Sequence, residues 1–221
     1  MSIPIHWFHA PLRRLFPEAL WTGDPTRREL ALTFDDGPHP ESTPHLLAQL
    51  ERLDIRATFF QVGRRAAAAP HLTRALVEAG HQVGLHGLDH RSFLLRSPGE
   101  VLEELAAVQA LLAEATGRDP VTFRAVRPPY GHFTPALLNA LLAAGYVPTM
   151  WSIVPLHWLQ PAEETIRQVL QEARGGDLLV LHESLPGPPV TALTDAILPP
   201  LLAEGYRFVT IDTMWAARYR A

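Results

Sequence analysis

The sequence of 221 residues contains no cysteine and no lysine, and each absence excludes a class of chemistry. Without cysteine there are no disulfides, no thiolate nucleophile, and no cysteine-ligated zinc or iron–sulfur site. Without lysine, Schiff-base catalysis and phosphate loops that depend on a lysine are excluded. A metal bound by this protein therefore needs His, Asp or Glu as its ligands.

The sequence also has no excess of positive charge. Its formal net charge is −4 and its pI is about 6.2, so no basic field attracts nucleic acid or an anionic membrane. Hydrophobic residues make up 47% and charged residues 19%, which is typical of a globular protein with a sizeable core. We expect a single domain that does not bind nucleic acid.

Long apolar runs are missing as well. No run reaches the roughly 18 residues that a membrane-spanning helix needs, so we expect no membrane span. Near the start of the chain, Pro4, His6, His9 and Pro11 interrupt every apolar run, and no signal-peptide pattern is found. We therefore expect a cytoplasmic location, whereas the sequence gives no indication of the oligomeric state.

Short apolar runs alternate with helical patterns along the chain. Several of these runs are continuously apolar, which is typical of parallel strands buried on both faces. We expect strands at residues 30–34, 57–62, 82–86, 123–127, 147–153, 178–182 and 207–211. We expect helices at residues 45–52, 70–79, 99–115, 135–144, 162–173 and 191–203. A glycine in the left-handed conformation is expected after five of the helices, at Gly80, Gly117, Gly145, Gly175 and Gly205.

This rhythm predicts an α/β fold, a single-domain (β/α) barrel of about seven parallel strands. A doubly wound open sheet fits the same pattern and is the alternative. Residues 1–28 precede the first strand and are expected to form an N-terminal arm on the surface, with residues 29–221 as the barrel.

Polar side chains stand at the carboxyl ends of five predicted strands, where a parallel barrel has its active site. Asp35 and Asp36 follow the first strand, and a Gly-Pro turn after them lets the two carboxylates take separate tasks. His86 and His90 follow the third strand with a spacing that suits a divalent metal. A plain turn and capping histidines are the alternative interpretations.

The other strand ends carry a cation and several rings. Arg127 follows the fourth strand and can hold a neighbouring aspartate ionised, because a nearby cation lowers the pKa of a carboxyl group. Tyr130 comes three residues later, and His157 with Trp158 follows the fifth strand. His182 ends the sixth strand and is a candidate general acid beside a metal site. A structural ion pair and core packing are the alternatives for these residues.

Several enzyme templates are absent. The sequence has no Gly-x-Ser-x-Gly elbow, no dinucleotide-binding glycine motif and no glycine-rich phosphate loop. The two histidines enclose no glutamate, so the zinc-protease motif lacks its base. A carboxylate from another strand would complete a site of two histidines and one aspartate with open positions for water and substrate.

Four segments resemble the successive motifs of the polysaccharide deacetylase family, the NodB-homology group or carbohydrate esterase family 4. They are Thr-Phe-Asp-Asp-Gly-Pro at 33–38, His-x-x-x-His at 86–90, Arg-Pro-Pro-Tyr-Gly at 127–131, and Val-Leu-His at 180–182. Order and spacing agree from about residue 29 to residue 212. The resemblance implies a distorted (β/α) barrel and hydrolysis of the N-acetyl amide of an acetylated amino sugar or polysaccharide, with release of acetate.

The resemblance also implies a metal and a base. Asp36, His86 and His90 would bind a divalent metal, usually zinc, with other ions such as cobalt as alternatives. Asp35 would be the general base, and Arg127 would orient it.

The remaining implied roles concern the substrate, an acetylated carbohydrate. The backbone N–H of Tyr130 would help to stabilise the oxyanion, and His182 would protonate the departing amine. Pro128, His157 and Trp158 would contact the substrate.

The sequence departs from the family pattern at four positions. Gly87 replaces a serine or threonine, and Val180 replaces a leucine. Val154 and His157 stand where the family has aspartates, one of which raises the pKa of the general-acid histidine. A neutral ring at 157 cannot raise the pKa of His182.

These departures keep other functions open. Asp89 and Glu183 are candidates to replace the missing aspartate. One alternative is another amide hydrolase on the same scaffold, such as a deformylase. The other is a sugar-binding protein that retains the metal but has little or no turnover.

Overall fold

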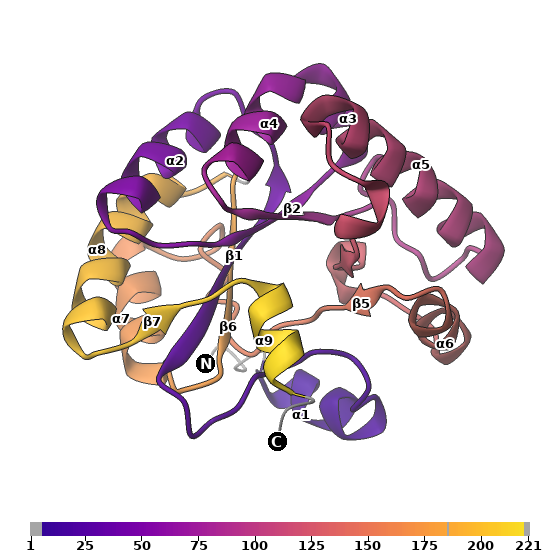
Figure 1. The fold of residues 1–221 in the computed structure, drawn as a ribbon. Coiled ribbons are helices and arrows are strands. Elements are labelled where there is room, and N and C mark those ends of the chain that lie inside the picture. Colours follow the sequence, from indigo (N-terminus) through magenta and orange to yellow (C-terminus); the bar gives the residue numbers. More distant parts are fainter. Residues whose placement is uncertain (1–5, 185, 219–221) are drawn as a thin grey trace.

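The computed structural model describes residues 6–184 and 186–218, in which strands and helices alternate (Figure 1). The strands are β1 (Glu29–Gly37), β2 (Thr58–Gln61), β3 (Gln82–Leu85), β4 (Ala125–Val126), β5 (Val147–Pro148), β6 (Leu178–His182) and β7 (Arg207–Phe208). The helices are α1 (His6–Leu15), α2 (Ser42–Arg52), α3 (Gly63–Ala68), α4 (Pro70–Glu78), α5 (Pro98–Thr116), α6 (Pro135–Ala143), α7 (Ala162–Glu172), α8 (Val190–Ala203) and α9 (Ile211–Ala217). Two 3₁₀ turns, η1 (Pro120–Thr122) and η2 (Pro129–Gly131), flank β4.

The strands form one parallel sheet that curls into an irregular barrel. Their order is β5-β4-β3-β2-β1-β6, and β7 pairs with the first residues of β1. Beyond β5 the chain turns toward β6, where Ile153 N–H donates to the Leu178 carbonyl at 3.0 Å and Val180 N–H donates to the Ile153 carbonyl at 2.9 Å. Because these bonds join the two ends of the sheet, the predicted distorted barrel is confirmed and the open sheet is wrong.

Helices cover the outside of the barrel, with α2, α4, α5, α7 and α8 arranged around the strands in Figure 1. All nine residues of β1 are buried, as expected for the central strand of such a layer. Phe34 of β1 stacks on Phe59 of β2 with ring centroids 4.9 Å apart. Burial of one such side chain stabilises the fold by about 1.5–3 kcal/mol. Among the described residues, no helix has both the length and the apolar character to cross a membrane.

Local signals set the ends of several helices. The Ser97 hydroxyl caps α5, and the Glu100 carboxylate bonds back to the Ser97 N–H, which forms a complete capping box. Four of the five predicted glycines have a positive φ after a helix, but the prediction for Gly175 is wrong. Gly176 takes the positive φ instead. A Cβ on Gly175 would lie 2.3 Å from the Arg27 carbonyl oxygen. Gly175 is therefore required for close approach of two backbones.

The structure corrects some element boundaries. The strands predicted at 123–127, 147–153 and 207–211 are two residues long, and the last ends early because Thr210 caps the short helix α9. The segment expected as an arm contains α1, with Pro11 inside it, and Leu20 forms a parallel bridge to Thr149 after β5. Residues 1–5 lie outside the described residues.

Candidate metal centre and active site

The carboxyl ends of the strands open into a cleft of about 390 Å³, at the position that a parallel barrel predicts. Side chains from β1 and β6 and from the loops after β3, β4 and β5 meet there. The lining consists of Asp35, Asp36, His86, His90, Pro128, Tyr130, Trp151, Val154, Leu156, Trp158, Val180 and His182. The structure thus brings together eight of the ten residues singled out in the sequence, while Arg127 and His157 lie behind this surface.

Three side chains place their donor atoms around one point. Asp36 Oδ1 is 3.2 Å from His90 Nε2 and 3.6 Å from His86 Nε2, and all three atoms lie within 4.8 Å of one another. His86 Nδ1 is 2.7 Å from the Arg127 carbonyl oxygen, which can only accept, so this nitrogen carries the proton. His86 Nε2 therefore presents a lone pair toward Asp36.

This donor set fits a divalent metal. Two ring nitrogens and a carboxylate oxygen are ligands for zinc and related ions, and three protein ligands leave positions open for water and substrate. A carbonyl that fixes the ring of a histidine ligand is a usual feature of such sites. Asp36, His86 and His90 could hold the ion here.

The loop that carries His86 and His90 is held from two sides. Gly87 has φ of +75°, a conformation that residues other than glycine adopt only with strain. Its carbonyl accepts from Gly63 N–H at 2.9 Å, and Leu88 N–H donates to Glu104 Oε1 at 2.9 Å. Glu104 of α5 thus stabilises the loop, and sequence reasoning missed it because it lies 16 residues beyond the loop segment it binds.

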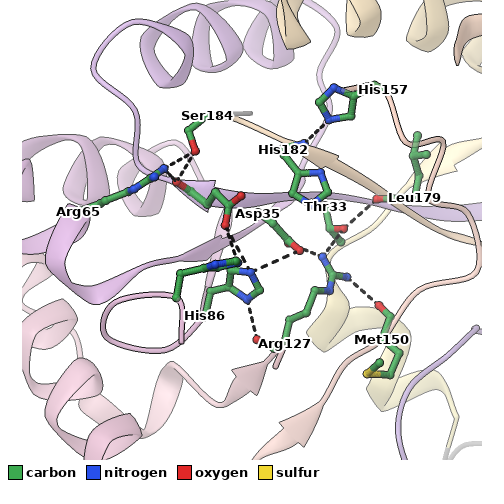
Figure 2. A network of polar contacts seen from close by, with 12 residues as sticks. Thr33, Asp35, Arg65, His86, Arg127, Met150, His157, Leu179, His182 and Ser184 are labelled. Carbon is green, nitrogen blue, oxygen red and sulfur yellow. Dashed lines mark hydrogen bonds and ion pairs between the residues drawn. The ribbon is translucent and has the colours of Figure 1, made fainter. Parts of the chain in front are cut away.

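Asp35 lies beside this site and is held by a buried guanidinium. Arg127 Nη1 donates to Asp35 Oδ1 at 2.5 Å and to Thr33 Oγ1 at 2.8 Å, while Nη2 donates to the Met150 carbonyl at 2.8 Å (Figure 2). The Arg127 side chain is 0% exposed and stacks over the Phe60 ring, 4.1 Å from its centroid. These contacts fix the orientation of the Asp35 carboxylate.

The charge of Asp35 follows from the same contacts. Burial opposes the ionised form, but the positive charge of Arg127, aided by His86, outweighs burial and holds the pKa of Asp35 below its ordinary value. Asp35 Oδ2 lies 3.9 Å from His86 Nε2, on the side of the metal ligands. The structure therefore presents a carboxylate able to accept a proton next to the candidate metal centre.

Within residues 6–184 and 186–218, the ring of His182 is not held by hydrogen bonds as the Asp35 carboxylate is. Its Nδ1 atom is buried without a hydrogen-bond partner among the described residues, and the same holds for His157 Nδ1. The rings lie 5.5 Å apart, but His157 Nε2 accepts from the backbone N–H of His182 at 3.1 Å rather than from its ring (Figure 2). Burial lowers the pKa of His182 and lowers the pKa of His157 to about 4. His157 is 1% exposed and lies outside the lining of the cleft.

The two carboxylates proposed as substitutes lie elsewhere. Asp89 pairs with Arg91 at 2.7 Å. Glu183 points to the outer side of β6, where its carboxyl group accepts from the Thr43 hydroxyl of α2, and burial raises its pKa to about 8. In the part of the chain that the structure describes, neither carboxylate bonds to the ring of His182.

Tyr130 and Trp158 both line the cleft, each against a histidine of the site. Tyr130 is 61% exposed, has φ of +60°, and packs edge-on against His90 with centroids 4.6 Å apart. The next residue, Gly131, is required because a Cβ there would lie 2.4 Å from the Trp151 ring. Trp158 packs edge-on against His182 at 4.8 Å. Sequence reasoning singled out Tyr130 and Trp158 but missed the other apolar side chains of the lining.

Arg65 of α3 is a further residue that sequence reasoning missed. Its Nη1 donates to the Asp36 carbonyl. It also donates to the Ser184 hydroxyl, as Figure 2 shows. It therefore ties the end of β1 to the loop after β6. The sequence offers no signal for this contact, because Arg65 stands in a polar and alanine-rich stretch without a motif.

Comparison with known proteins agrees with this geometry. The family profile described as Polysaccharide deacetylase matches residues 22–149. The chain belongs to the polysaccharide deacetylase family. A peptidoglycan-N-acetylglucosamine deacetylase of Bacillus cereus is 33% identical over 198 residues, which cover 88% of this chain and 91% of that protein. A chitooligosaccharide deacetylase of Azorhizobium caulinodans is 34% identical over 189 residues, covering 79% and 89%.

Solved structures of the family share the fold. A peptidoglycan N-acetylglucosamine deacetylase, solved in complex with 4-naphthalen-1-yl-N-oxidanyl-benzamide, superimposes with a TM-score of 0.82 and 28% sequence identity. The match covers 88% of this chain and 91% of that chain. The family membership thus extends over nearly all of the barrel described above.

Proposed function

We propose that this protein is a metal-dependent hydrolase that removes the N-acetyl group from an amino sugar of an oligosaccharide or polysaccharide and releases acetate. The observation that carries this proposal is the meeting of the three metal donors, Asp36, His86 and His90, with the Asp35–Arg127 pair on one rim. The names of the relatives, which are deacetylases of peptidoglycan N-acetylglucosamine and of chitooligosaccharides, support the same substrate class.

The three donors would hold zinc, with cobalt as an alternative that the same ligand types accept. A divalent cation in this position supplies Lewis-acid polarisation of the acyl carbonyl and lowers the pKa of water beside it. The His86 ring is already in the tautomer that presents Nε2 to the ion.

Asp35 is the proposed general base. Its Oδ1 is bonded to Arg127, so Oδ2 is the atom free to take the proton from the attacking water. Arg127 acts through Asp35, because it keeps the carboxylate charged and fixed in direction. The new C–O bond forms as Asp35 accepts this proton.

The departing amine needs a proton before the C–N bond breaks. We assign this transfer to the ring of His182, which lines the same cleft as the metal donors. The backbone N–H of Tyr130 is the proposed donor to the acyl oxygen as negative charge develops there. Pro128 and Trp158 line the cleft and would contact substrate, whereas the buried His157 would act by positioning His182.

The two alternatives raised by the sequence, a deformylase and a binding protein without turnover, gain no specific support from the described residues. A cytoplasmic location stays a prediction.

The test is metal-dependent acid release. Protein stripped with a chelator and reloaded with zinc or cobalt is assayed for acetate and free amine on N-acetyl and N-formyl chitooligosaccharides. We expect acetate release only with metal, loss of release in His90→Ala, and no change in His71→Ala, an exposed histidine on α4. Bound metal without release from any substrate would contradict the proposal in favour of a binding protein, and release of formate alone would indicate a deformylase.

A further inference from the structure

The start of helix α3 contacts both segments that carry the metal donors. Val62 N–H, just before the helix, donates at 2.9 Å to the carbonyl of Gly37, the residue after Asp36. Gly63 N–H donates at 2.9 Å to the carbonyl of Gly87, the residue after the first histidine ligand. This part of the chain therefore joins the two ligand-bearing segments and fixes their spacing.

The first residue of α3 also packs closely against the loop of the two histidine ligands. A Cβ on Gly63 would lie 2.8 Å from Val108 Cγ2 and 3.3 Å from the Leu88 Cα atom. Both distances are shorter than the roughly 3.5–4.0 Å of a good carbon–carbon contact. Glycine at this position therefore lets the helix approach the loop, and the side chains of α3 begin close to the metal donors.

Arg65, two residues further along α3, adds a side-chain contact to the third ligand. Its Nη1 donates to the backbone carbonyl of Asp36 and to the Ser184 hydroxyl, and that hydroxyl lies 3.5 Å from the same carbonyl. Figure 2 shows the contact between Arg65 and Ser184. Asp36 has φ of +66°, which is strained for a residue with a side chain. The bond from Arg65 holds the peptide plane after Asp36 in place and so stabilises this strained conformation.

We propose that Arg65 is a positioning residue for the metal ion. By holding the Asp36 backbone, it fixes the direction in which the carboxylate leaves the chain, with Oδ1 3.2 Å from His90 Nε2 and 3.6 Å from His86 Nε2. Residues outside the ligand set that orient the ligands are typically worth about tenfold to a hundredfold in metal affinity. The inference rests on the metal site of the proposed function and names a residue that sets its affinity.

Positioning and charge predict opposite effects of Arg65 on the ion. The guanidinium is positive and repels a metal cation, so removal of its charge alone would tighten binding. Loss of the contact to the Asp36 carbonyl would weaken binding, because the carboxylate would then have to be ordered when the ion binds. The sign of the change in affinity therefore separates the two effects.

The experiment measures the zinc affinity of the metal-free protein by competition with a chromogenic chelator. In Arg65→Met, which keeps an unbranched side chain without a donor, we expect the zinc dissociation constant to rise by about tenfold to a hundredfold. Arg65→Lys keeps one donor group and the charge, so its affinity should lie between those of Arg65→Met and the wild type. Arg64→Met, at the exposed neighbouring arginine, should bind zinc as tightly as the wild type.

Ser184→Ala shows through which partner Arg65 acts. It removes the other acceptor of Arg65 but leaves the Asp36 carbonyl, so we expect zinc affinity close to that of the wild type. Equal losses of affinity in Ser184→Ala and Arg65→Met would overturn the inference, since Arg65 would then act through the loop after β6.

A second measurement reports the geometry of the ligands rather than affinity. The visible absorption spectrum of the cobalt-loaded protein depends on coordination geometry, so it should change in Arg65→Met and stay the same in Arg64→Met. Urea denaturation of the metal-free proteins checks that each variant is folded before metal is added. Unchanged or tighter zinc binding in Arg65→Met, with an unchanged cobalt spectrum, would overturn the inference while leaving the deacetylase proposal intact. A wild type that binds no zinc would instead refute the metal site and the proposed function with it.

Discussion

The two halves of the site differ in how completely their polar groups are satisfied. In the metal-and-base half, Asp35, His86 and Arg127 are linked by bonds of 2.5–2.8 Å to one another or to backbone carbonyls. In the proton-donor half, His157 and His182 each have a buried Nδ1 without a partner among the described residues, and in the metal-and-base half Arg127 Nε is the corresponding buried atom without one. Buried polar groups usually have partners, so the second half is energetically less supported than the first.

The difference follows from the elements that build each half. Asp35, His86 and Arg127 stand at the carboxyl ends of β1, β3 and β4 of one sheet, whose ladder fixes their spacing. The donor half combines β6 with a loop after β5, and this loop holds Leu156 at positive φ. The sheet therefore fixes the position of the base, Asp35. In the loop after β5, a substitution at a single residue, His157, can change the pKa of the proton donor, His182.

The largest effect is expected when the Asp35–Arg127 pair of the metal-and-base half is broken. Arg127→Met leaves Asp35 buried and unpaired, and loss of one partner of a buried ion pair costs about 3–5 kcal/mol. We expect the free energy of unfolding to fall by this amount in urea denaturation, together with loss of acid release.

Arg124→Met is the matched control. Arg124 pairs with Asp212 at 3.2 Å, and both side chains are more than a third exposed, so its loss should cost less than about 1 kcal/mol. Equal destabilisation of the two variants would show that the buried pair does not organise the metal-and-base half.

A smaller effect concerns Glu183, on the outer side of β6. Burial raises its pKa in the folded protein to about 8 from an ordinary value of 4.5. Below pH 4.5 the group is protonated in both states and has no effect. As the pH rises from 4.5 to 8, only the unfolded chain ionises, so the folded state loses stability, by about 3 kcal/mol between pH 5 and 8. Glu183→Gln should remove this loss, measured by urea denaturation across that range.

The control for this pH dependence is Glu163→Gln, an exposed residue at the start of α7. It should keep the wild-type slope of stability against pH. Parallel curves for wild type and Glu183→Gln would mean that Glu183 is ionised when folded.

The smallest effect is expected from a substitution that gives the proton-donor half a charged neighbour for His182. In His157→Asp, a carboxylate replaces the ring beside His182 and raises the pKa of that histidine, which burial now lowers. We expect kcat on N-acetyl substrates to rise roughly threefold to tenfold and the alkaline limb of the pH–rate profile to move up by about one unit. His157→Asn keeps an acceptor without the charge and should do neither. Equal profiles for the two variants would exclude a charge effect at this position.

Much of the site could be predicted because chemistry-bearing residues follow buried strands. Asp35, Asp36, His86 and Arg127 stand at strand ends, and parallel strands bring their carboxyl ends together. The glycines after helices were predictable for a similar reason, since a left-handed residue commonly ends a helix. These features depend on local pattern and sheet topology alone.

What could not be predicted depends on contacts between distant segments. Glu104 reaches the metal loop from the middle of α5, and nothing in its surroundings distinguishes it from other charged helix residues. His157 stood out as a departure, but its bond to the backbone of His182 depends on the path of the loop after β5. The strand expected at 147–153 is short because the chain there turns from β4 toward β6. The spacing of apolar residues in the sequence does not show that a segment changes the strand with which it pairs.

The most direct test of the account is to separate metal binding from proton transfer in Asp35→Asn. Asp35 is placed outside the metal ligands but beside them, with Oδ2 3.9 Å from His86 Nε2. Zinc affinity, measured by competition with a chromogenic chelator, should stay within about threefold of wild type, while acid release should fall by roughly 10²–10⁴-fold, the usual contribution of a general base. Retained acid release, or loss of zinc binding together with activity, would contradict the assignment of Asp35 as the base.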